Sequence, residues 1–256
     1  MTFEEFVHRI EATFEPIGVS DVDGEFGAVA NSDREIERVA YATNLDPITA
    51  AQAVALGVDA LVTHHDAWDF LLGLRLEAHG ILADDGISHV FVHLPLDAAP
   101  FGTAATLAER LGLRIKKPFA VFEGLPCGRV GRLDRPIPIA DLANRLRAVT
   151  AAAVRTWTFG PRRVERIGVT TGAGSLTDVI EEAVDLGCDT YVTGESSLYA
   201  VQYARYRKIN LIVGTHTQTE LPGVAHLCDR IASDTGLEFI EIPEGDFESG
   251  RLTDRS

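Results

Sequence analysis

The most constraining feature of this sequence is a strand, helix and strand pattern that occurs twice. The segments VAYATNLDPITAAQAVALGVDALVTHH (39 to 65) and VTTGAGSLTDVIEEAVDLGCDTYVTGE (169 to 195) share the string L-G-x-D-x-x-V-T. Each reads as a strand, a turn, a helix of about ten residues and a second apolar strand, which is a βαβ unit that builds parallel sheet. The pattern therefore predicts an internal duplication, with coincidence between two ordinary βαβ units as the alternative.

Residues typical of helix starts and helix ends occur at matching places in the two copies. Asp46 followed by Pro47 is typical of an N-cap with proline at the first helical position, and Ser175 or Thr177 could cap the second copy. Glycines at 57 and 187 stand where a helix commonly ends in the left-handed conformation. These boundaries favour a short helix between the two strands of each copy.

The rest of the chain extends both copies in the same way. Each βαβ unit is followed by another helical stretch and another apolar strand, ending in VFVHLPLD in the first copy and in LIVGTHTQTE in the second. We therefore expect an α/β protein of two similar α/β lobes, residues 1 to 118 and 119 to 256, with KKPFAVFEGLPCG as the crossing between them. The polar tail PEGDFESGRLTDRS is expected to fray.

Composition restricts the class of protein. Hydrophobic residues make up 46% of the 256 positions, and no apolar run approaches the roughly 18 residues that a membrane span needs. The N-terminal stretch is acidic and amphipathic, unlike a secretory signal, so a cytoplasmic protein without a membrane segment is expected. Cys127, Cys188 and Cys228 form no C-x-x-C pair, which favours buried thiols over a disulfide framework or a thiolate zinc site.

The net charge argues against nucleic-acid binding. The formal net charge is −15, lysine is rare, and no basic run is longer than RIKK or PRRVER. A phosphate backbone would be repelled by such a surface unless the arginines were gathered in one patch. A small molecule is therefore a better expected ligand than a nucleic acid.

Histidines and carboxylates cluster just past the expected strands. In open α/β sheets, binding sites gather outside the carboxyl ends of the strands. The residues at these places are His64, His65, Asp97, Glu195, His216 and Glu220. The duplication makes Glu195 the positional counterpart of His65, so histidine and carboxylate recur at equivalent places.

The adjacent histidines suggest more than one ion. Neighbouring residues of a regular strand point to opposite faces, but at a strand end their side chains can diverge, so that each could hold a different ion. A catalytic zinc usually takes about three protein ligands, so three histidines and two carboxylates suit two ions better than one. A lone histidine is more often a satisfied polar residue, and Pro222 favours a helix that begins after the His216 to Glu220 segment.

Several motifs resemble those of one known family. LVTHH, HLPLD and GTHTQTELPG occur in this order, with TGAGS and TGE between the second and third. In this order they resemble the motifs of the GTP cyclohydrolase 1 type 2 homologue family along nearly the whole chain. The resemblance departs at Asp66, where the family usually has proline after the histidine pair, and at HLPLD, which replaces H-T-N-L-D.

The resemblance implies a dinuclear metal centre. Carried over residue by residue, its ligands are His64, His65, Asp97, His216 and Glu220. It also implies two α/β lobes with the metals in the cleft between them, commonly assembled as a toroidal homohexamer. Mixed imidazole and carboxylate ligands fit two divalent ions such as zinc, manganese, iron or cobalt without selecting one.

Two functions follow from these expectations. One is a metal-dependent hydrolase that acts on a cyclic amide, a nucleotide or a phosphoester, with Glu195 and His93 as candidates for proton transfer or for support of the ligands. The other is a metal-binding or regulatory scaffold ring without turnover. The glycine-rich TTGAGS could hold an anion at a helix N-terminus, although an ordinary turn is the simpler interpretation.

Overall fold

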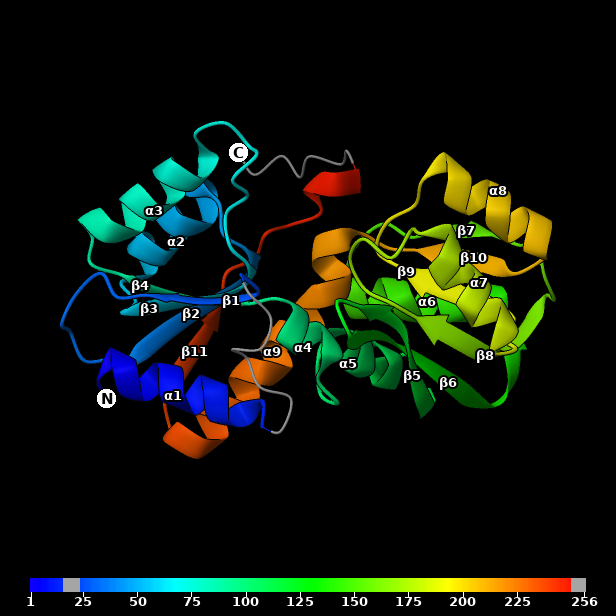
Figure 1. Ribbon diagram of the computed structural model, residues 1–256, viewed down its shortest axis with the longest axis horizontal. Helices are drawn as coiled ribbons and strands as arrows, with labels where there is room; N and C mark the ends of the chain where they lie inside the picture. The colour runs from blue at the N-terminus through cyan, green and yellow to red at the C-terminus, as the bar shows by residue number, and fades with distance from the viewer. Residues whose placement is uncertain (16–23, 250–256) are drawn as a thin grey trace. The chain divides into compact units, whose positions relative to one another are not determined.

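The computed structural model describes residues 1–15 and 24–249, which divide into two compact units (Figure 1). The first unit comprises Met1–Ala99 and Val224–Glu244, and the second comprises Pro100–Gly223 with the described C-terminal residues 245–249. One helix, α9 (His216–Thr235), begins in the second unit and ends in the first. Each unit is an α/β lobe built on one sheet.

The first unit is a five-stranded sheet of order β1-β4-β3-β2-β11. The strands β2, β3, β4 and β11 are parallel, and β1 runs antiparallel at the edge. Small and aliphatic side chains of α2 and α3 pack on one face of β2 and β3, and α1 lies on the other face (Figure 1). The elements are α1 (Phe3–Thr13), β1 (Phe26–Val29), β2 (Arg38–Asn44), α2 (Pro47–Leu56), β3 (Ala60–His65), α3 (Leu74–Asp84), β4 (Ser88–Val92), α4 (Leu94–Ala98) and β11 (Glu238–Glu241).

The second unit is a six-stranded sheet of order β5-β6-β8-β9-β10-β7. The central strands β8, β9 and β10 are parallel, and the remaining pairs are antiparallel. One core lies between this sheet and α5 and α6, and a second lies between it and α7 and α8, so that helices cover both faces. The elements are α5 (Thr103–Arg110), β5 (Arg114–Phe122), β6 (Leu125–Pro138), α6 (Ile139–Thr150), β7 (Arg155–Trp157), β8 (Arg163–Val169), α7 (Thr177–Asp185), β9 (Thr190–Thr193), α8 (Leu198–Arg207), β10 (Asn210–Val213) and the 3-10 turn η1 (Phe247–Ser249).

The two units share a βαβαβ arrangement, and the aspartate of the repeated L-G-x-D string has the same role in both. Asp59 accepts hydrogen bonds from the backbone amides of residues 37 and 38, at the start of β2. Asp189 accepts from the backbone amides of residues 165 and 166, early in β8. In each unit this carboxylate ties the start of the middle strand to its neighbour, so the repeat is structural and the expected pair of similar lobes is confirmed.

The unit boundaries differ from the division at residue 118 that the sequence suggests. Residue 118 lies inside β5, which pairs antiparallel with β6, and β6 in turn pairs with β8. The chain therefore enters the second unit at Pro100. It also returns to the first unit near its C-terminus, because β11 adds to the edge of the sheet beside β2.

The predicted ends of α2 agree with the structure, but the predicted cap of α7 and the predicted fraying of the tail do not. Asp46 caps α2 through the backbone amide of Thr49, and Gly57 ends that helix with φ 62°. The expected cap of α7 by Ser175 or Thr177 is wrong, because the N-cap is Leu176 and no side chain caps this helix. The tail does not simply fray, because Asp246 accepts from the backbone amide of Ala153. Residues 250–256 lie outside the described part of the chain.

No helix within residues 1–15 and 24–249 is both long enough and apolar enough to cross a membrane.

Candidate metal centre

The histidine pair closes the buried strand β3. All six residues of this strand are buried, and His65 still pairs with Asn44 of β2. Pairing with β4, by contrast, ends at Thr63 and Phe91. The two imidazole centroids are only 4.4 Å apart, so the side chains do not point to opposite faces as they would in a regular strand.

His64 has one ring nitrogen held by the backbone. Its Nδ1 lies 2.8 Å from the carbonyl oxygen of Val92. A carbonyl can only accept, so Nδ1 carries the proton and donates it. In a neutral ring Nε2 then bears the lone pair, and this atom lies 3.5 Å from a carboxylate oxygen of Asp97 in α4. His64 and Asp97, both predicted ligands, are therefore neighbours in the first unit.

His65 is held in the same tautomer by a chain of polar contacts. Its Nδ1 lies 2.8 Å from Oδ1 of Asn44, and Nδ2 of Asn44 donates to Glu244 at 2.7 Å. Because the amide nitrogen is committed to Glu244, the amide oxygen accepts from His65. Glu244 also accepts from the backbone amides of Thr43 and Asn44, and its burial raises its pKa to about 7. Sequence reasoning missed this chain, since β11 leads Glu244 back from the far end of the sequence.

A third histidine joins the pair. The ring of His93 lies 5.0 Å from that of His64 and 5.1 Å from that of His65, and the three residues can offer nitrogens within 4.8 Å of one another. His93 Nδ1 bonds the carboxylate of Glu25. Nothing in the sequence signals Glu25, which precedes β1 and comes close only through the pairing of β1 with β4.

The second unit carries the remaining predicted ligands on the first turns of α9. His216 Nδ1 lies 2.6 Å from Oε1 of Glu195, and Nε2 lies 3.3 Å from Oε1 of Glu220. The expectation that this helix begins after Pro222 is wrong, since it begins at His216 and places Glu220 one turn along on the same side. Glu248 stabilises this early start by accepting from the backbone amides of His216 and Thr217, at 2.6 and 2.8 Å.

The glycine-rich TTGAGS stretch is a turn packed against these ligands. Gly172 has φ +54°, and a Cβ there would collide with the Glu220 carboxylate and lie 2.8 Å from His216 Nε2. Its backbone amide donates to Thr219 Oγ1 at 3.1 Å. The absence of a Cβ at Gly172 thus allows the side chains of Glu220 and His216 to lie close to the backbone of this turn.

The carboxylates around His216 favour its charged form. Burial lowers the pKa of His216, but the carboxylates of Glu220 and Glu195 outweigh it and raise this pKa to about 11. The hydrogen bond from His216 in turn lowers the pKa of Glu195. Without a bound metal ion, His216 is therefore protonated. Its positive charge then compensates the carboxylates of Glu195 and Glu220, as an ion would do.

One property is shared by the three histidines that were predicted as ligands. Each has an oxygen acceptor within 2.8 Å of Nδ1, and these acceptors are Val92 O, Asn44 Oδ1 and Glu195 Oε1. Protein histidines that bind metals are typically oriented by such a bond to the other nitrogen. The residues present therefore fit a divalent metal bound through Nε2. The structure brings His64, His65, His93 and Asp97 together in one unit, and Glu195, His216 and Glu220 together in the other.

Comparison with known proteins gives one consistent result. The Duf34/NIF3 (NGG1p interacting factor 3) profile matches residues 1–246. A GTP cyclohydrolase 1 type 2 homolog of Halobacterium salinarum is 34% identical over 227 residues, covering 85% of this chain and 88% of that protein. A protein of the same name from Treponema pallidum is 31% identical over 258 residues, covering 85% and 89%.

Solved structures agree with the fold. The structural genomics protein ybgI, of unknown function, has a TM-score of 0.83 and 26% identity, covering 95% of this chain and 99% of that one. TTHA1606 from Thermus thermophilus has a TM-score of 0.80 at 24% identity, covering 96% and 99%, and at that identity it supports the fold alone.

Proposed function

The chain belongs to the Duf34/NIF3 (NGG1p interacting factor 3) family, and on this premise we propose that it is a metal-dependent hydrolase with a dinuclear centre. The ligands are His64, His65 and Asp97 of the first unit and His216 and Glu220 of the second, and zinc, manganese, iron and cobalt all fit such a set. The observation that carries this proposal is the common state of the three histidines. Each has an oxygen acceptor at Nδ1, so Nε2 is the atom that an ion would take, after loss of the second proton in the case of His216.

The donor set decides what chemistry is available. Two divalent ions at such a site lower the pKa of a shared water and polarise a carbonyl, imidazole or phosphoryl centre of the substrate. Glu220 is buried, which favours a carboxylate that is neutralised by more than one positive charge. Glu220 is therefore the residue that would hold both ions, if two were bound.

Two other residues support the reaction. His93 is part exposed and has Glu25 at Nδ1, so its Nε2 is the atom that takes a proton from water and returns it to the leaving group. Glu195, a sequence candidate for the same task, is committed to His216 Nδ1 and instead orients that ligand.

A pocket in the second unit offers a place for the substrate. Its lining includes Arg155, Glu195, Ser196, Thr215 and Glu248. The Arg155 guanidinium lies 5.6 Å from the ring centre of Trp157, which fixes a positive charge at the pocket. A polar or anionic small molecule fits this lining, and the name of the relatives directs the first assays to nucleotides, with cyclic amides and phosphoesters after them.

The proposal is tested by metal content together with turnover. Protein loaded with each candidate ion is assayed against a panel of nucleotides, cyclic amides and phosphoesters. A substrate turned over by the wild type and by Glu109→Gln, an exposed control on α5, but not by Glu220→Gln supports the hydrolase. Two bound ions with no turnover of any panel member would instead favour a non-catalytic scaffold ring, and fewer than two ions would contradict the dinuclear centre.

We propose further that the protein is a cytoplasmic homo-oligomer, with a hexamer as the expected form. Phe70, Leu72 and Leu76 of the first unit are highly exposed, and so are Tyr199 and Tyr206 of the second. Apolar side chains gathered on a surface commonly mark contacts between subunits. Light scattering that reports a 27.7 kDa particle would contradict self-association.

A further inference from the structure

A second group of possible metal ligands lies in the first unit. Asp66 follows β3, His79 lies on α3 and His89 lies on β4, and their donor atoms all fall within 4.8 Å of one another. None of the three belongs to the ligand set proposed above. Asp66 also stands where the family described above usually has proline.

The hydrogen bonds around Thr63 fix the tautomer of His89. The Thr63 hydroxyl donates to the carbonyl oxygen of His65 at 2.7 Å, and it has only one hydrogen to give. Its contact with His89 Nε2, at 2.8 Å, must therefore be a bond in which the ring donates. The proton of His89 is on Nε2, and the lone pair is on Nδ1.

That lone pair is buried and has no hydrogen-bond partner. His89 is 0% exposed, and its Nδ1 is among the buried polar atoms without a partner. Burial lowers the pKa of His89 to about 3, so the ring is neutral near pH 7. A buried acceptor left without a donor is costly, and its presence calls for an occupant at this point.

Asp66 presents one carboxylate oxygen to the histidines and the other to an arginine. Oδ1 lies 2.7 Å from His79 Nε2, and Oδ2 lies 2.9 Å from Arg75 Nη2. Arg75 is itself balanced by Asp69 at 2.6 Å. The arginine thus orients the carboxylate from behind, as outer partners of metal ligands typically do, and leaves Oδ1 toward the histidines.

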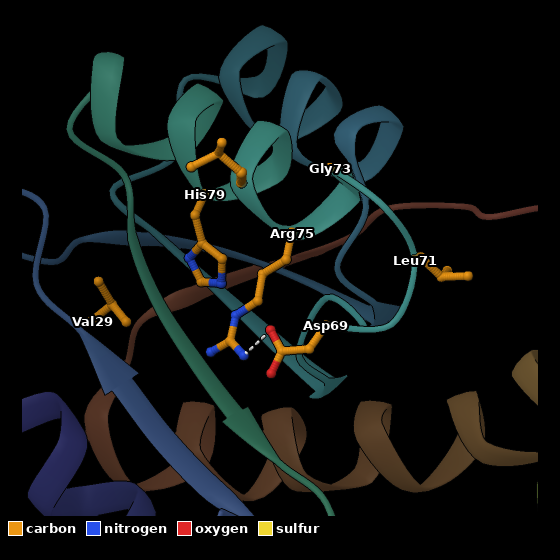
Figure 2. Close-up of a pocket in the computed structure, with 7 residues that line it drawn as sticks. Val29, Asp69, Leu71, Gly73, Arg75 and His79 are labelled. Carbon is orange, nitrogen blue, oxygen red and sulfur yellow. Dashed lines mark hydrogen bonds and ion pairs between the residues drawn. The ribbon is translucent and has the colours of Figure 1, made fainter.

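We propose that Asp66, His79 and His89 form a separate site for one divalent transition-metal ion, held by Asp66 Oδ1, His79 Nε2 and His89 Nδ1. Two imidazoles and one carboxylate suit zinc, cobalt or nickel, and three protein ligands leave a position for water. His79 also lines a surface pocket with Asp69 and Arg75, which gives an ion a path to the site (Figure 2). The ion would join the end of β3 to α3 and β4.

The experiment locates cobalt in crystals of the full-length protein. The chain is stripped with a chelator, saturated with Co²⁺ alone, and examined by anomalous scattering at the cobalt edge. An anomalous peak at bonding distance from His89 Nδ1, Asp66 and His79 is expected. Because the readout is a position, it is independent of how many ions bind at His64 and His65. Absence of this peak at saturating cobalt would overturn the site.

A matched pair of variants measures the contribution of the ligands in solution. His79→Gln is expected to lose one Co²⁺ ion, or to bind it at least about tenfold more weakly, while keeping every other ion. His8→Gln, which changes a histidine that is 79% exposed on α1, serves as the control and should match the wild type. Asp66→Asn, which preserves side-chain volume, is measured as well, so a failure of His79→Gln to fold does not end the test. Wild-type stoichiometry and affinity in the variants that fold would contradict the proposal.

Discussion

The two units carry equivalent strand ends, but they support their histidines with groups of different charge. In the first unit, His64 is backed by a neutral carbonyl of Val92 and His65 by the amide of Asn44. In the second, His216 lies between the carboxylates of Glu195 and Glu220. The duplicated scaffold therefore fixes where each candidate ligand lies, and the groups that contact its ring decide whether it is protonated in the absence of an ion.

The test with the largest expected effect removes one proposed ligand of the second unit and, separately, each of two in the first unit. If Glu220 bridges two ions as proposed, Glu220→Ala is expected to weaken both together by more than about 100-fold, because it would delete a shared ligand and not only an outer partner. His64→Ala and His65→Ala should each weaken mainly one ion. Elemental analysis after dialysis reads out the count, with Glu109→Ala as the control. Loss of the same single ion in all three variants would show that Glu220 does not hold both ions. It would also contradict the proposal that the two units supply different ligands.

Acidity should act more strongly on the second unit. The pKa of His216, raised to about 11, means that an ion must displace its proton near pH 7. Affinity for this ion is therefore expected to rise with pH, by about tenfold per unit for one proton released. Calorimetric titration in buffers of different ionisation enthalpy measures the released protons. Binding that releases none between pH 6 and 8 would contradict the protonated state of His216.

The raised pKa of His216 also makes the stability of the metal-free protein depend on pH. A histidine whose pKa is higher in the folded state than in the unfolded state contributes stability that is full below the unfolded value of about 6.5. This contribution is lost as the pH rises toward 11. The metal-induced increase in Tm should accordingly grow with pH, and thermal melts of loaded and stripped protein would show it.

Variants of Asn44 and Glu195, which contact Nδ1 of His65 and His216, test the same comparison with smaller expected losses of metal affinity. Glu195→Gln and Asn44→Ala are each expected to weaken metal binding by roughly 10- to 100-fold, the usual range for outer partners of histidine ligands. Glu195→Gln should have the greater effect and should also flatten the pH dependence, since it removes a charge that holds the proton on His216. Equal losses with unchanged pH dependence would show that charge is not what separates the two units.

The smallest expected effect concerns Glu244, which supports His65 through Asn44. Its pKa is raised to about 7 by burial, so its protonated form is favoured in the folded state. Stability from this group is full below its unfolded pKa near 4.5 and is lost as the pH rises toward 7. Glu244→Gln should remove this slope in chemical denaturation and change metal affinity by less than about tenfold. A slope that persists in the variant would place its origin elsewhere.

The βαβ units could be predicted because their signals are local. Asp59 and Asp189 occur in a repeated string, and Asp46 followed directly by Pro47 indicates the start of a helix. The supporting contacts could not be predicted in this way. Glu25 and Glu244 reach His93 and Asn44 only through strand pairing at the edges of the sheet, and no short pattern records which edge a distant strand joins.

The start of α9 shows a different limit of sequence reasoning. Proline at 222 argues correctly that an interior amide is missing, and from this the helix was expected to begin later. The carboxylate of Glu248 stabilises an earlier helix start, because it accepts hydrogen bonds from two backbone amides of the first turn. A residue in an apparently loose tail therefore determines whether His216 and Glu220 share one helical face.

The return of the chain to its first sheet has a consequence for how the protein is made. The β11 strand pairs with β2, yet it follows the whole sequence of the second sheet. As the chain leaves the ribosome, the strand that bears His64 and His65 is synthesised early, but its sheet lacks an edge until residue 241 has emerged. For most of translation, His64 and His65 therefore lie in a sheet that still lacks its edge strand β11. A metal ion at this pair would be best acquired after release, when Glu244 can accept a hydrogen bond from Asn44.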